Sequence, residues 1–342
     1  ESKFVVLSDS SVDSNGPSRK DLLPPHHHAI RVRRGPTGSE IRSSIFEGGN
    51  PRDFRLPLRE QVDRDVADYI ERHRLFLPGT LGRDNIFKID SPQLAIIYDE
   101  RNAKATQIAQ MYTRFESKTP NLILVIGGDG TMLKAIRDHW RKRLPFLGLN
   151  AGHLGFLMNA SLPGDLSGIE LISQSLPLLR VDVRYPDGRS SMHLAYGDTW
   201  IERAEGQAAW LKVSVNGDTQ IEKVVGDGML IATAAGSSAY ARAMGAVPVP
   251  LDSQSLVLAG SNIFQPRFWN PMNLPSTSRI TLTSLDQSGK RPLRAFIDGQ
   301  ALGLVQEISA RQSLTASVEL AFTKEFDPSM KLLKSLFPSD VE

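Results

Sequence analysis

A short apolar run that ends in a glycine-rich turn restricts the possible folds of this chain more than any other feature. Residues 122–126 read Leu-Ile-Leu-Val-Ile and are followed directly by Gly-Gly-Asp-Gly-Thr at 127–131. A run that is apolar at every position and rich in β-branched residues is typical of a strand buried on both faces of a parallel sheet. Gly127 and Gly128 let the backbone turn sharply and approach a ligand without an intervening Cβ atom.

The same turn carries groups that can do chemistry. Asp129 places a carboxylate at the carboxyl end of the predicted strand, where ligands bind in open α/β sheets. Thr131 can cap the helix that follows, so these few residues also form a candidate anion site. We therefore take this turn as the predicted chemical centre of the chain.

The composition excludes several classes of protein. The 342 residues, 40% hydrophobic and 23% charged, suit a soluble globular protein of about two domains. The balance of 40 basic and 38 acidic residues gives no global case for a nucleic-acid or anionic-membrane partner. The lack of cysteine excludes disulfides, thiolate catalysis and Cys-bound zinc.

The apolar stretches of the sequence are too short to form a membrane-spanning helix. None of them approaches the roughly 18 residues of a membrane helix, so we expect no membrane association. A cytoplasmic location is expected, and organellar targeting stays open because the first residue is Glu1 and not Met.

The first 91 residues differ in pattern from the rest of the chain. Residues 1–58 are rich in Ser, Pro, Gly and Arg after a strand-like piece at 4–7, which predicts an irregular, mobile arm. Apolar residues at helical spacing over 59–76 predict an accessory helix, so residues 59–91 are expected to form this helix and a linker.

Strand and helix patterns alternate over residues 92–178. Residues 94–98, 122–126 and 146–150 read as strands, and residues 102–115 and 131–143 carry apolar residues on one helical face. Because strands and helices alternate in this order, we expect a doubly wound parallel sheet in an α/β domain.

Turn signals replace helical periodicity beyond about residue 178. Asn216-Gly217 separates two strand-like runs and is a strong hairpin signal, and Asp298-Gly299 marks a further turn. A β-rich domain is therefore expected over residues 179–325. Residues 326–342 are expected to form a short helical tail.

Three further segments accompany the glycine-rich turn. Residues 149–157 read Leu-Asn-Ala-Gly-His-Leu-Gly-Phe-Leu, residues 226–228 read Gly-Asp-Gly, and residues 233–240 read Thr-Ala-Ala-Gly-Ser-Ser-Ala-Tyr. In this order and at these distances, the segments resemble the NAD kinase family. The related diacylglycerol and sphingosine kinases have a similar GGDGT turn but neither the first nor the third of these segments.

The resemblance runs from about residue 93 to about residue 325 and implies both a fold and an activity. The implied fold class is α/β plus all-β, with a Rossmann-like N-terminal parallel sheet domain, a β-sandwich-like C-terminal domain and a nucleotide site between them. Such enzymes transfer the γ-phosphoryl group of ATP to the adenosine 2′-hydroxyl of NAD, with Mg²⁺ or another divalent cation, giving NADP. NAD and ATP are thus the implied ligands, and a homodimer or homotetramer is the expected assembly.

Position by position, the resemblance gives Asp129 the catalytic role of general base or metal-linked orienter. This agrees with phosphoryl transfer, which mainly needs positioning, charge neutralisation and one acceptor for the hydroxyl proton. Phe156 matches an aromatic residue of the adenine pocket, and Asp227 matches an aspartate near the nicotinamide-side ribose. The candidate nucleotide-binding residues are Gly127, Gly128, Gly130, Thr131, Asn150, Gly152, Phe156, Asp198, Asp227, Ser238, Ala239 and Tyr240, and no residue is assigned as a metal ligand.

Three positions depart from the family pattern. Gly197 replaces an Asn, Ala235 replaces a hydroxyl residue, and Ala243 stands where Ser is common. A buried hydrogen bond contributes about 0.5–1.5 kcal/mol, so losing three lowers acceptor affinity roughly tenfold to a thousandfold unless other contacts compensate. Two alternatives to an NAD kinase therefore stay open. One is a related kinase with a different hydroxyl acceptor, and the other is a non-catalytic sensor that binds NAD(P) or ATP.

Overall fold

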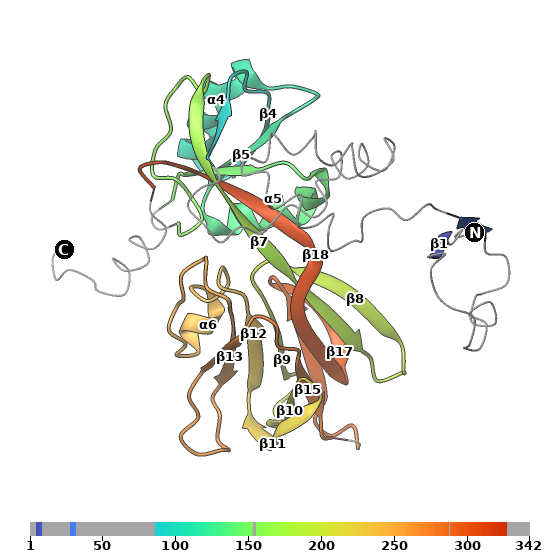
Figure 1. The fold of residues 1–342 in the computed structure, drawn as a ribbon. Helices are drawn as coiled ribbons and strands as arrows, with labels where there is room; N and C mark the ends of the chain where they lie inside the picture. Colours follow the sequence, from blue (N-terminus) through green and yellow to red (C-terminus); the bar gives the residue numbers. More distant parts are fainter. Residues whose placement is uncertain (1–4, 9–27, 32–85, 153–154, 287, 327–342) are drawn as a thin grey trace, which may run out of the picture. The chain divides into compact units, whose positions relative to one another are not determined.

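The computed structural model describes residues 5–8, 28–31, 86–152, 155–286 and 288–326 (Figure 1). Its contacts divide the chain into two compact units, residues 1–78 and residues 79–342. In the first unit, strand β1 (Val5–Ser8) pairs in parallel with β2 (His28–Arg31), and β1 overlaps the strand predicted at residues 4–7. The helices predicted over residues 59–76 and within residues 326–342 lie outside the described residues.

The second unit begins with the predicted alternation of strands and helices. Strands β4 (Leu94–Tyr98), β5 (Leu122–Gly127) and β6 (Phe146–Asn150) pair in parallel, with β5 in the middle. Helix α4 (Ala103–Tyr112) follows β4, and helix α5 (Asp129–His139) follows β5. Every residue of β5 is buried, as its continuous apolar run predicts.

The two helices cover opposite faces of this parallel sheet. Ile123 and Val125 belong to the same buried cluster as Met132 of α5. Leu122 and Leu124 belong instead to the cluster that contains Tyr112 of α4. Because successive side chains of a strand point to opposite faces, this division places one helix on each face and confirms the doubly wound arrangement.

Two long antiparallel strands continue the sheet beyond the parallel part. Strand β7 (Ile169–Arg184) pairs with β18 (Glu307–Thr323) along most of its length, and the two run side by side in Figure 1. Strand β18 also pairs in parallel with β6 at one end and antiparallel with β15 (Ile280–Ser284) at the other. The boundary predicted between residues 178 and 179 therefore falls inside β7.

The remaining strands of this ten-stranded sheet flank the long pair. Strand β3 (Ile86–Ile89) and strand β8 (Ser190–Ala195) both pair with β7. Strand β10 (Ala209–Val215) pairs with β15 and with β11 (Asp218–Gly226). Asn216 and Gly217, between β10 and β11, have φ angles of 55° and 97°, which confirms the predicted tight hairpin.

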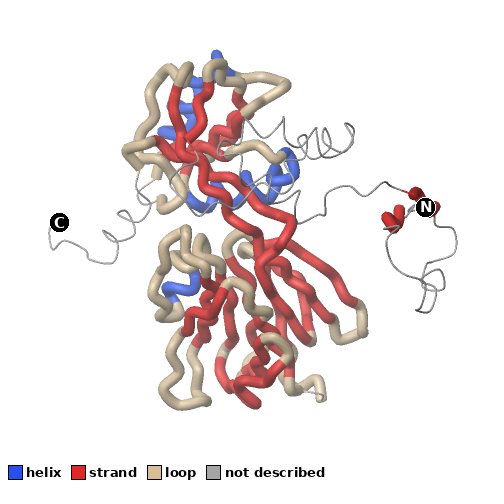
Figure 2. The backbone as a smooth tube through the Cα atoms, viewed as in Figure 1, coloured by secondary structure: helices blue, strands red, loops and turns tan. Residues whose placement is uncertain are grey.

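A six-stranded antiparallel sheet completes the second unit, in which strands predominate (Figure 2). Its order is β14 (Met272–Pro275), β13 (Ser255–Ser261), β12 (Gly228–Ala232), β9 (Asp198–Arg203), β16 (Leu293–Ile297) and β17 (Gln300–Val305). Leu211 and Leu282 of the first sheet share a buried cluster with Ile201, Ile231 and Leu258 of the second. The two sheets therefore form the predicted β-sandwich around a common apolar core.

Short helix α6 (Tyr240–Ala243) and the segment after it cover the outer face of the six-stranded sheet. Ala241 of α6 is buried with Leu230 of β12 and with Val257 of β13. None of the helices among the described residues is long and apolar enough to cross a membrane.

Gly228, the last glycine of the Gly-Asp-Gly segment, is required by strand packing. A Cβ atom at this position would lie 2.4 Å from the carbonyl oxygen of Ile201 and 2.8 Å from the Cα atom of Glu202. Both are backbone atoms of β9, which pairs directly with β12, so neither can move without disturbing the ladder. Strand packing therefore requires glycine at this position whether or not a ligand binds nearby.

We predict that Gly228→Ala destabilises the fold by about 1–3 kcal/mol, the usual cost of overpacking a tight core. Urea unfolding of the purified protein measures the change. The control is Gly206→Ala, because a Cβ atom at Gly206 would have no neighbour within 4 Å. Equal stabilities of the two variants would contradict the prediction.

Candidate functional site

The glycine-rich turn joins β5 directly to α5. A Cβ atom on Gly127 would lie 2.4 Å from Oγ1 of Thr131, so only glycine fits at the end of the strand. Gly128 precedes the helix in an extended conformation, and its carbonyl accepts from the N–H groups of Thr131 and Met132 at 3.0 and 3.1 Å. Gly130 is exposed in the first turn of the helix.

The prediction that Thr131 caps this helix is wrong. The helix begins at Asp129, so the N-cap position falls to Gly128, which has no side chain to form a capping hydrogen bond. Thr131 already lies inside the first turn, where its side chain faces Gly127. The strand runs straight into the helix, and the chain thus reaches helical geometry two residues earlier than the sequence pattern suggested.

Asp129 links two of the segments that the sequence singled out. Its Oδ2 atom accepts from the N–H of Phe156 at 2.8 Å, and its Oδ1 atom accepts from the N–H of Leu157 at 3.0 Å. The carboxylate also lies in the first turn of α5, where the helix dipole favours negative charge. These contacts orient the carboxylate and bring the half-buried Phe156 beside it.

Asn150 and Gly152 shape the turn after β6. The side-chain oxygen of Asn150 accepts from the N–H of Gly152 at 3.0 Å, and Gly152 itself is exposed. Gly127 takes part as well, because its carbonyl accepts from the N–H of Ala151 at 2.8 Å. The ends of β5 and β6 are thereby tied together next to Asp129.

A second group of candidate residues gathers around Asp298, which the sequence analysis did not select as a site residue. The Asp298 carboxylate accepts from the N–H groups of Tyr196 at 2.7 Å, Gly197 at 2.8 Å and Asp198 at 3.1 Å. The sequence offered only the Asp298-Gly299 turn signal, which says nothing about a partner one hundred residues away.

Asp198 is a buried acid with a strongly altered titration. The residue is only 7% exposed, and burial, followed by the nearby charge of Asp298, raises its pKa to about 7. Tyr196 is buried as well, and its hydroxyl has no hydrogen-bond partner among the described residues. Burial, followed by the charges of Asp129 and Asp298, raises the pKa of Tyr196 well above its ordinary value, so this phenol stays protonated.

The Thr233–Tyr240 segment packs directly against Gly197. The N–H of Thr233 donates to the carbonyl of Gly197 at 2.8 Å, and the Thr233 hydroxyl donates to the carbonyl of Tyr196 at 2.8 Å. A Cβ atom on Gly236 would lie 2.2 Å from the carbonyl oxygen of Gly197, so this approach requires glycine.

The end of this segment reaches the protein surface. Ser238 is half-buried, Ala239 is exposed, and Tyr240 is 38% exposed with its ring edge-on to Trp200 at 5.2 Å. The pKa of Tyr240 is raised by partial burial and by the charges of Glu202, Asp227 and Asp198. Tyr240 therefore lies close enough to Asp198 and Asp227, two predicted site residues, for their charges to affect its pKa.

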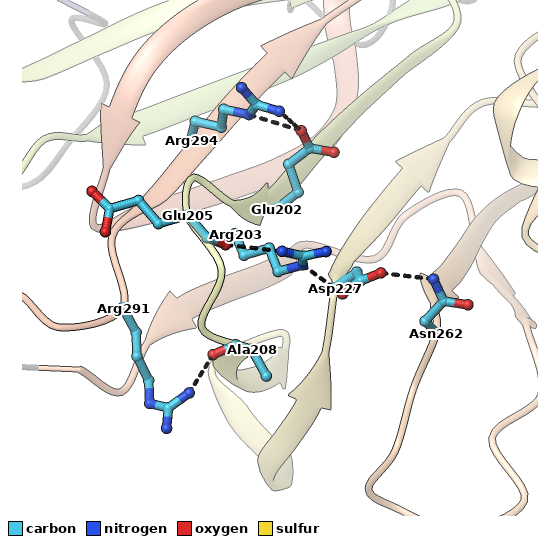
Figure 3. Close-up of polar contacts among 8 residues, drawn as sticks. All are labelled: Glu202, Arg203, Glu205, Ala208, Asp227, Asn262, Arg291 and Arg294. Carbon is cyan, nitrogen blue, oxygen red and sulfur yellow. Dashed lines mark hydrogen bonds and ion pairs between the residues drawn. The ribbon is translucent and has the colours of Figure 1, made fainter.

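Asp227 is already engaged by side chains of the protein (Figure 3). Its Oδ1 atom accepts from Nε of Arg203 at 2.6 Å, and its Oδ2 atom accepts from Nδ2 of Asn262 at 2.7 Å. The bond from Asn262 and the contact with Arg203 lower its pKa, so Asp227 stays ionised. A ligand at Asp227 would have to share the carboxylate with these two residues.

The contacts join the candidate residues in separate groups. Asp129 is bonded to Phe156. Gly236 lies against the backbone of Gly197, whose neighbour Asp198 is bonded to Asp298. Among the described residues, no group of three or more His, Asp or Glu side chains is arranged to hold a metal ion.

The chain is similar in sequence to one group of enzymes. The family model described as the ATP-NAD kinase N-terminal domain matches residues 59–167. The NAD kinase of Rickettsia bellii is 32% identical over 253 residues, which cover 72% of this chain and 98% of that protein. The NAD kinase of Rickettsia africae is 33% identical over 254 residues, with the same coverage of both chains.

Two solved structures share the fold. Yeast NADH kinase complexed with NADH matches with a TM-score of 0.60 and 17% identity, over 73% of this chain and 89% of that one. An NAD kinase from Archaeoglobus fulgidus in complex with ATP matches with a TM-score of 0.55 and 19% identity, over 70% of this chain and 98% of that one. These matches confirm the predicted fold class of an α/β domain followed by a β-sandwich.

We predict that Asp198→Asn gains stability relative to the wild type as the pH rises from about 4 to about 7. The folded protein keeps a proton on Asp198 up to a pKa of about 7, whereas the unfolded chain releases it near 3.8. The contribution of Asp198 to the unfolding free energy of the wild type is therefore fully present below pH 3.8 and is lost as the pH rises to about 7. The difference should grow by up to about 1.4 kcal/mol per pH unit.

Urea unfolding of both proteins at several pH values measures this difference. Asp138→Asn on α5 is the control, since the Asp138 side chain is 46% exposed. A difference between wild type and Asp198→Asn that stays constant with pH would show that folding does not raise the pKa of Asp198.

Proposed function

The chain belongs to the NAD kinase family, and from that premise we propose that it transfers the γ-phosphoryl group of ATP to the adenosine 2′-hydroxyl of NAD, giving NADP. The observation that carries this proposal is the placement of Asp129. Its carboxylate stands at the carboxyl end of β5, oriented by two backbone N–H groups. Ligands of open α/β sheets bind at this edge.

In the proposed reaction, Asp129 accepts the proton of the attacking hydroxyl. The bonds from Phe156 and Leu157 hold the carboxylate in one orientation, so less freedom is lost when the hydroxyl binds. Each carboxylate oxygen has two lone pairs, and a hydroxyl can therefore donate to Asp129 while both N–H bonds are kept. One positioned acceptor is what phosphoryl transfer requires of the protein at this atom.

The proposed donor and cation are ATP and Mg²⁺. Mg²⁺ is usually held by one or two carboxylates together with substrate phosphates, and not by a protein cage. In this mode Asp129, at the carboxyl end of β5, would be the carboxylate that takes part in holding the cation. A bound divalent cation would neutralise the phosphate charge during transfer.

The ligands named for the solved relatives support the same pairing of substrates. The yeast protein is an NADH kinase complexed with NADH, and the Archaeoglobus fulgidus protein is an NAD kinase in complex with ATP. A cytoplasmic homodimer or homotetramer remains our expectation for the assembled protein. No observation favours a different hydroxyl acceptor or a sensor without catalysis.

We predict that purified protein forms NADP from NAD and ATP only when a divalent cation is present. A coupled assay with an NADP-specific dehydrogenase measures the product, and the same assay with excess chelator is the control. Full activity in chelator would contradict the role of the cation. Binding of NAD without any NADP formation would favour the sensor alternative.

We predict that Asp129→Asn lowers kcat by about a hundredfold to ten-thousandfold, because Asn cannot accept the hydroxyl proton. The amide keeps one acceptor for the two N–H groups, so unfolding free energy should fall by only about 1–3 kcal/mol. Enzyme assay and thermal melting on the same preparation measure both effects. Asp138→Asn on the exposed face of α5 is the control.

A kcat within a few-fold of wild type for Asp129→Asn would show that Asp129 is not the catalytic residue. A large loss of stability with little change in kcat would assign it to the fold alone. These two outcomes separate the catalytic role from the turn-forming role of an aspartate.

We predict that the double variant Gly197→Asn, Ala235→Ser lowers the KM for NAD, because it restores two side chains that can form hydrogen bonds with the acceptor. Space at position 197 is tight but available, with the nearest atom, Oδ1 of Asp298, 3.3 Å from the new Cβ. Initial rates at varied NAD concentration measure the change. A higher KM would mean that the pocket is built around other contacts.

A further inference from the structure

Asp298 forms four hydrogen bonds with the three residues before and at the start of β9. Its carboxylate accepts from the N–H groups of Tyr196, Gly197 and Asp198 at 2.7, 2.8 and 3.1 Å. Its own N–H donates to the carbonyl of Asp198 at 3.0 Å. The backbone of residues 196–198 is thus held by one residue of the turn that follows β16.

The position of Asp298 follows from strand pairing and from turn geometry. Strand β16 ends at Ile297, which pairs with Thr199 of β9, so the next residue stands opposite Asp198. Asp298 has a φ of 44°, a left-handed conformation that aspartate tolerates better than most residues, and Gly299 completes the turn. This turn aims the carboxylate back at the three N–H groups.

The backbone around Gly197 depends on contacts with other segments to hold it in one conformation. Gly197 lacks a side chain, and a glycine backbone has more conformations to lose than any other residue. Thr233 and Gly236 contact the Gly197 carbonyl. Together with these contacts and the pairing of Asp198 with Ala232 of β12, the three bonds from Asp298 fix the backbone from which the Asp198 side chain projects.

Charge couples the two acids as well. Burial, followed by the charge of Asp298, raises the pKa of Asp198 to about 7. Burial raises the pKa of Asp298, and its three backbone bonds and the charge of Arg137 on α5 offset part of this rise. The charge of Asp198 also helps to raise the pKa of Tyr240. Both tyrosines, Tyr196 and Tyr240, have raised pKa values and stay neutral near pH 7.

We propose that Asp298 is a positioning residue for the acceptor nucleotide: by holding the backbone of residues 196–198, it places Asp198 for contact with the adenosine half of NAD. Asp298 does not touch the reacting atoms in this proposal and acts through Asp198. The inference rests on the proposed function only in the identity of the ligand.

The test is Asp298→Asn in the full chain. Asn offers one acceptor oxygen and cannot satisfy all three N–H groups, so the KM for NAD should rise about tenfold or more while kcat changes less than about threefold. Isothermal titration calorimetry should show a matching rise in the Kd for NAD, and the KM for ATP should stay within about twofold.

The pH profile supplies a readout that a merely structural role would not change. Ionised Asp198 accepts hydrogen bonds from hydroxyl and amino groups, so the KM for NAD should fall as the pH rises through about 7 in the wild type. Removing the negative charge at position 298 lowers the pKa of Asp198 and moves this change to lower pH in Asp298→Asn. An unshifted profile would overturn the proposal.

Asp286→Asn is the matched control. The Asp286 carboxylate also accepts from backbone N–H groups, those of Ser288 and Arg291 at 3.0 and 2.6 Å, but it belongs to a turn outside the candidate site. It should lose some stability without any change in the KM for NAD. An equal rise in KM for both variants would mean that general destabilisation, and not positioning, weakens binding.

A second variant covers the case in which Asp298→Asn does not fold. Asp298→Glu keeps the charge but lengthens the side chain, so it should raise the KM for NAD without moving the pH profile. An unchanged KM would overturn the proposal. If the wild type makes no NADP, the proposed function fails, but calorimetry of NAD binding still tests the role of Asp298. Equal Kd values of wild type and Asp298→Glu for NAD would then refute the positioning role.

Discussion

The pairing of β18 with its neighbours is the interaction on which the rest of the second unit depends. β18 pairs in parallel with β6 of the α/β part and antiparallel with β15 of the sandwich, while β7 runs along most of its length. A strand with partners in both parts makes one continuous sheet of them. The carboxyl end of β5 and the strands β9 and β16 belong to the same compact unit, as the proposed nucleotide site requires.

Four aspartates show how environment divides the roles of one residue type. Asp129 is oriented by two backbone N–H groups at a helix N-terminus, and Asp227 is bound by Arg203 and Asn262. Asp198 is buried beside Asp298 and titrates near neutral pH, whereas Asp298 uses its carboxylate for backbone bonds. The proposed chemistry falls to Asp129 because it is the one that combines a fixed orientation with a place at the strand edge where ligands bind.

Local structure could largely be predicted from the residues themselves. The apolar run at 122–126 forms the fully buried strand β5, as predicted, because a continuous apolar run suits a strand buried on both faces. Asn216-Gly217 forms a tight hairpin turn, as predicted, because both residues tolerate a left-handed conformation. The cap assigned to Thr131 failed since the start of a helix depends on the strand that precedes it. The glycines of two motifs, Gly228 and Gly236, could be recognised in the sequence, but the backbone atoms that require them could not.

The sequence by itself indicated the family, through four motifs in a characteristic order, and it predicted the local strands and turns, because these depend on neighbouring residues. Only the tertiary structure decided what the carboxylates touch. Asp298 binds residues 100 to 102 positions away, and Asp129 binds residues 27 and 28 positions away. Hydrogen bonds between distant segments leave no local sequence pattern, since an aspartate suits many kinds of turn. Only the pairing of β9 with β16 brings three backbone N–H groups to the Asp298 carboxylate.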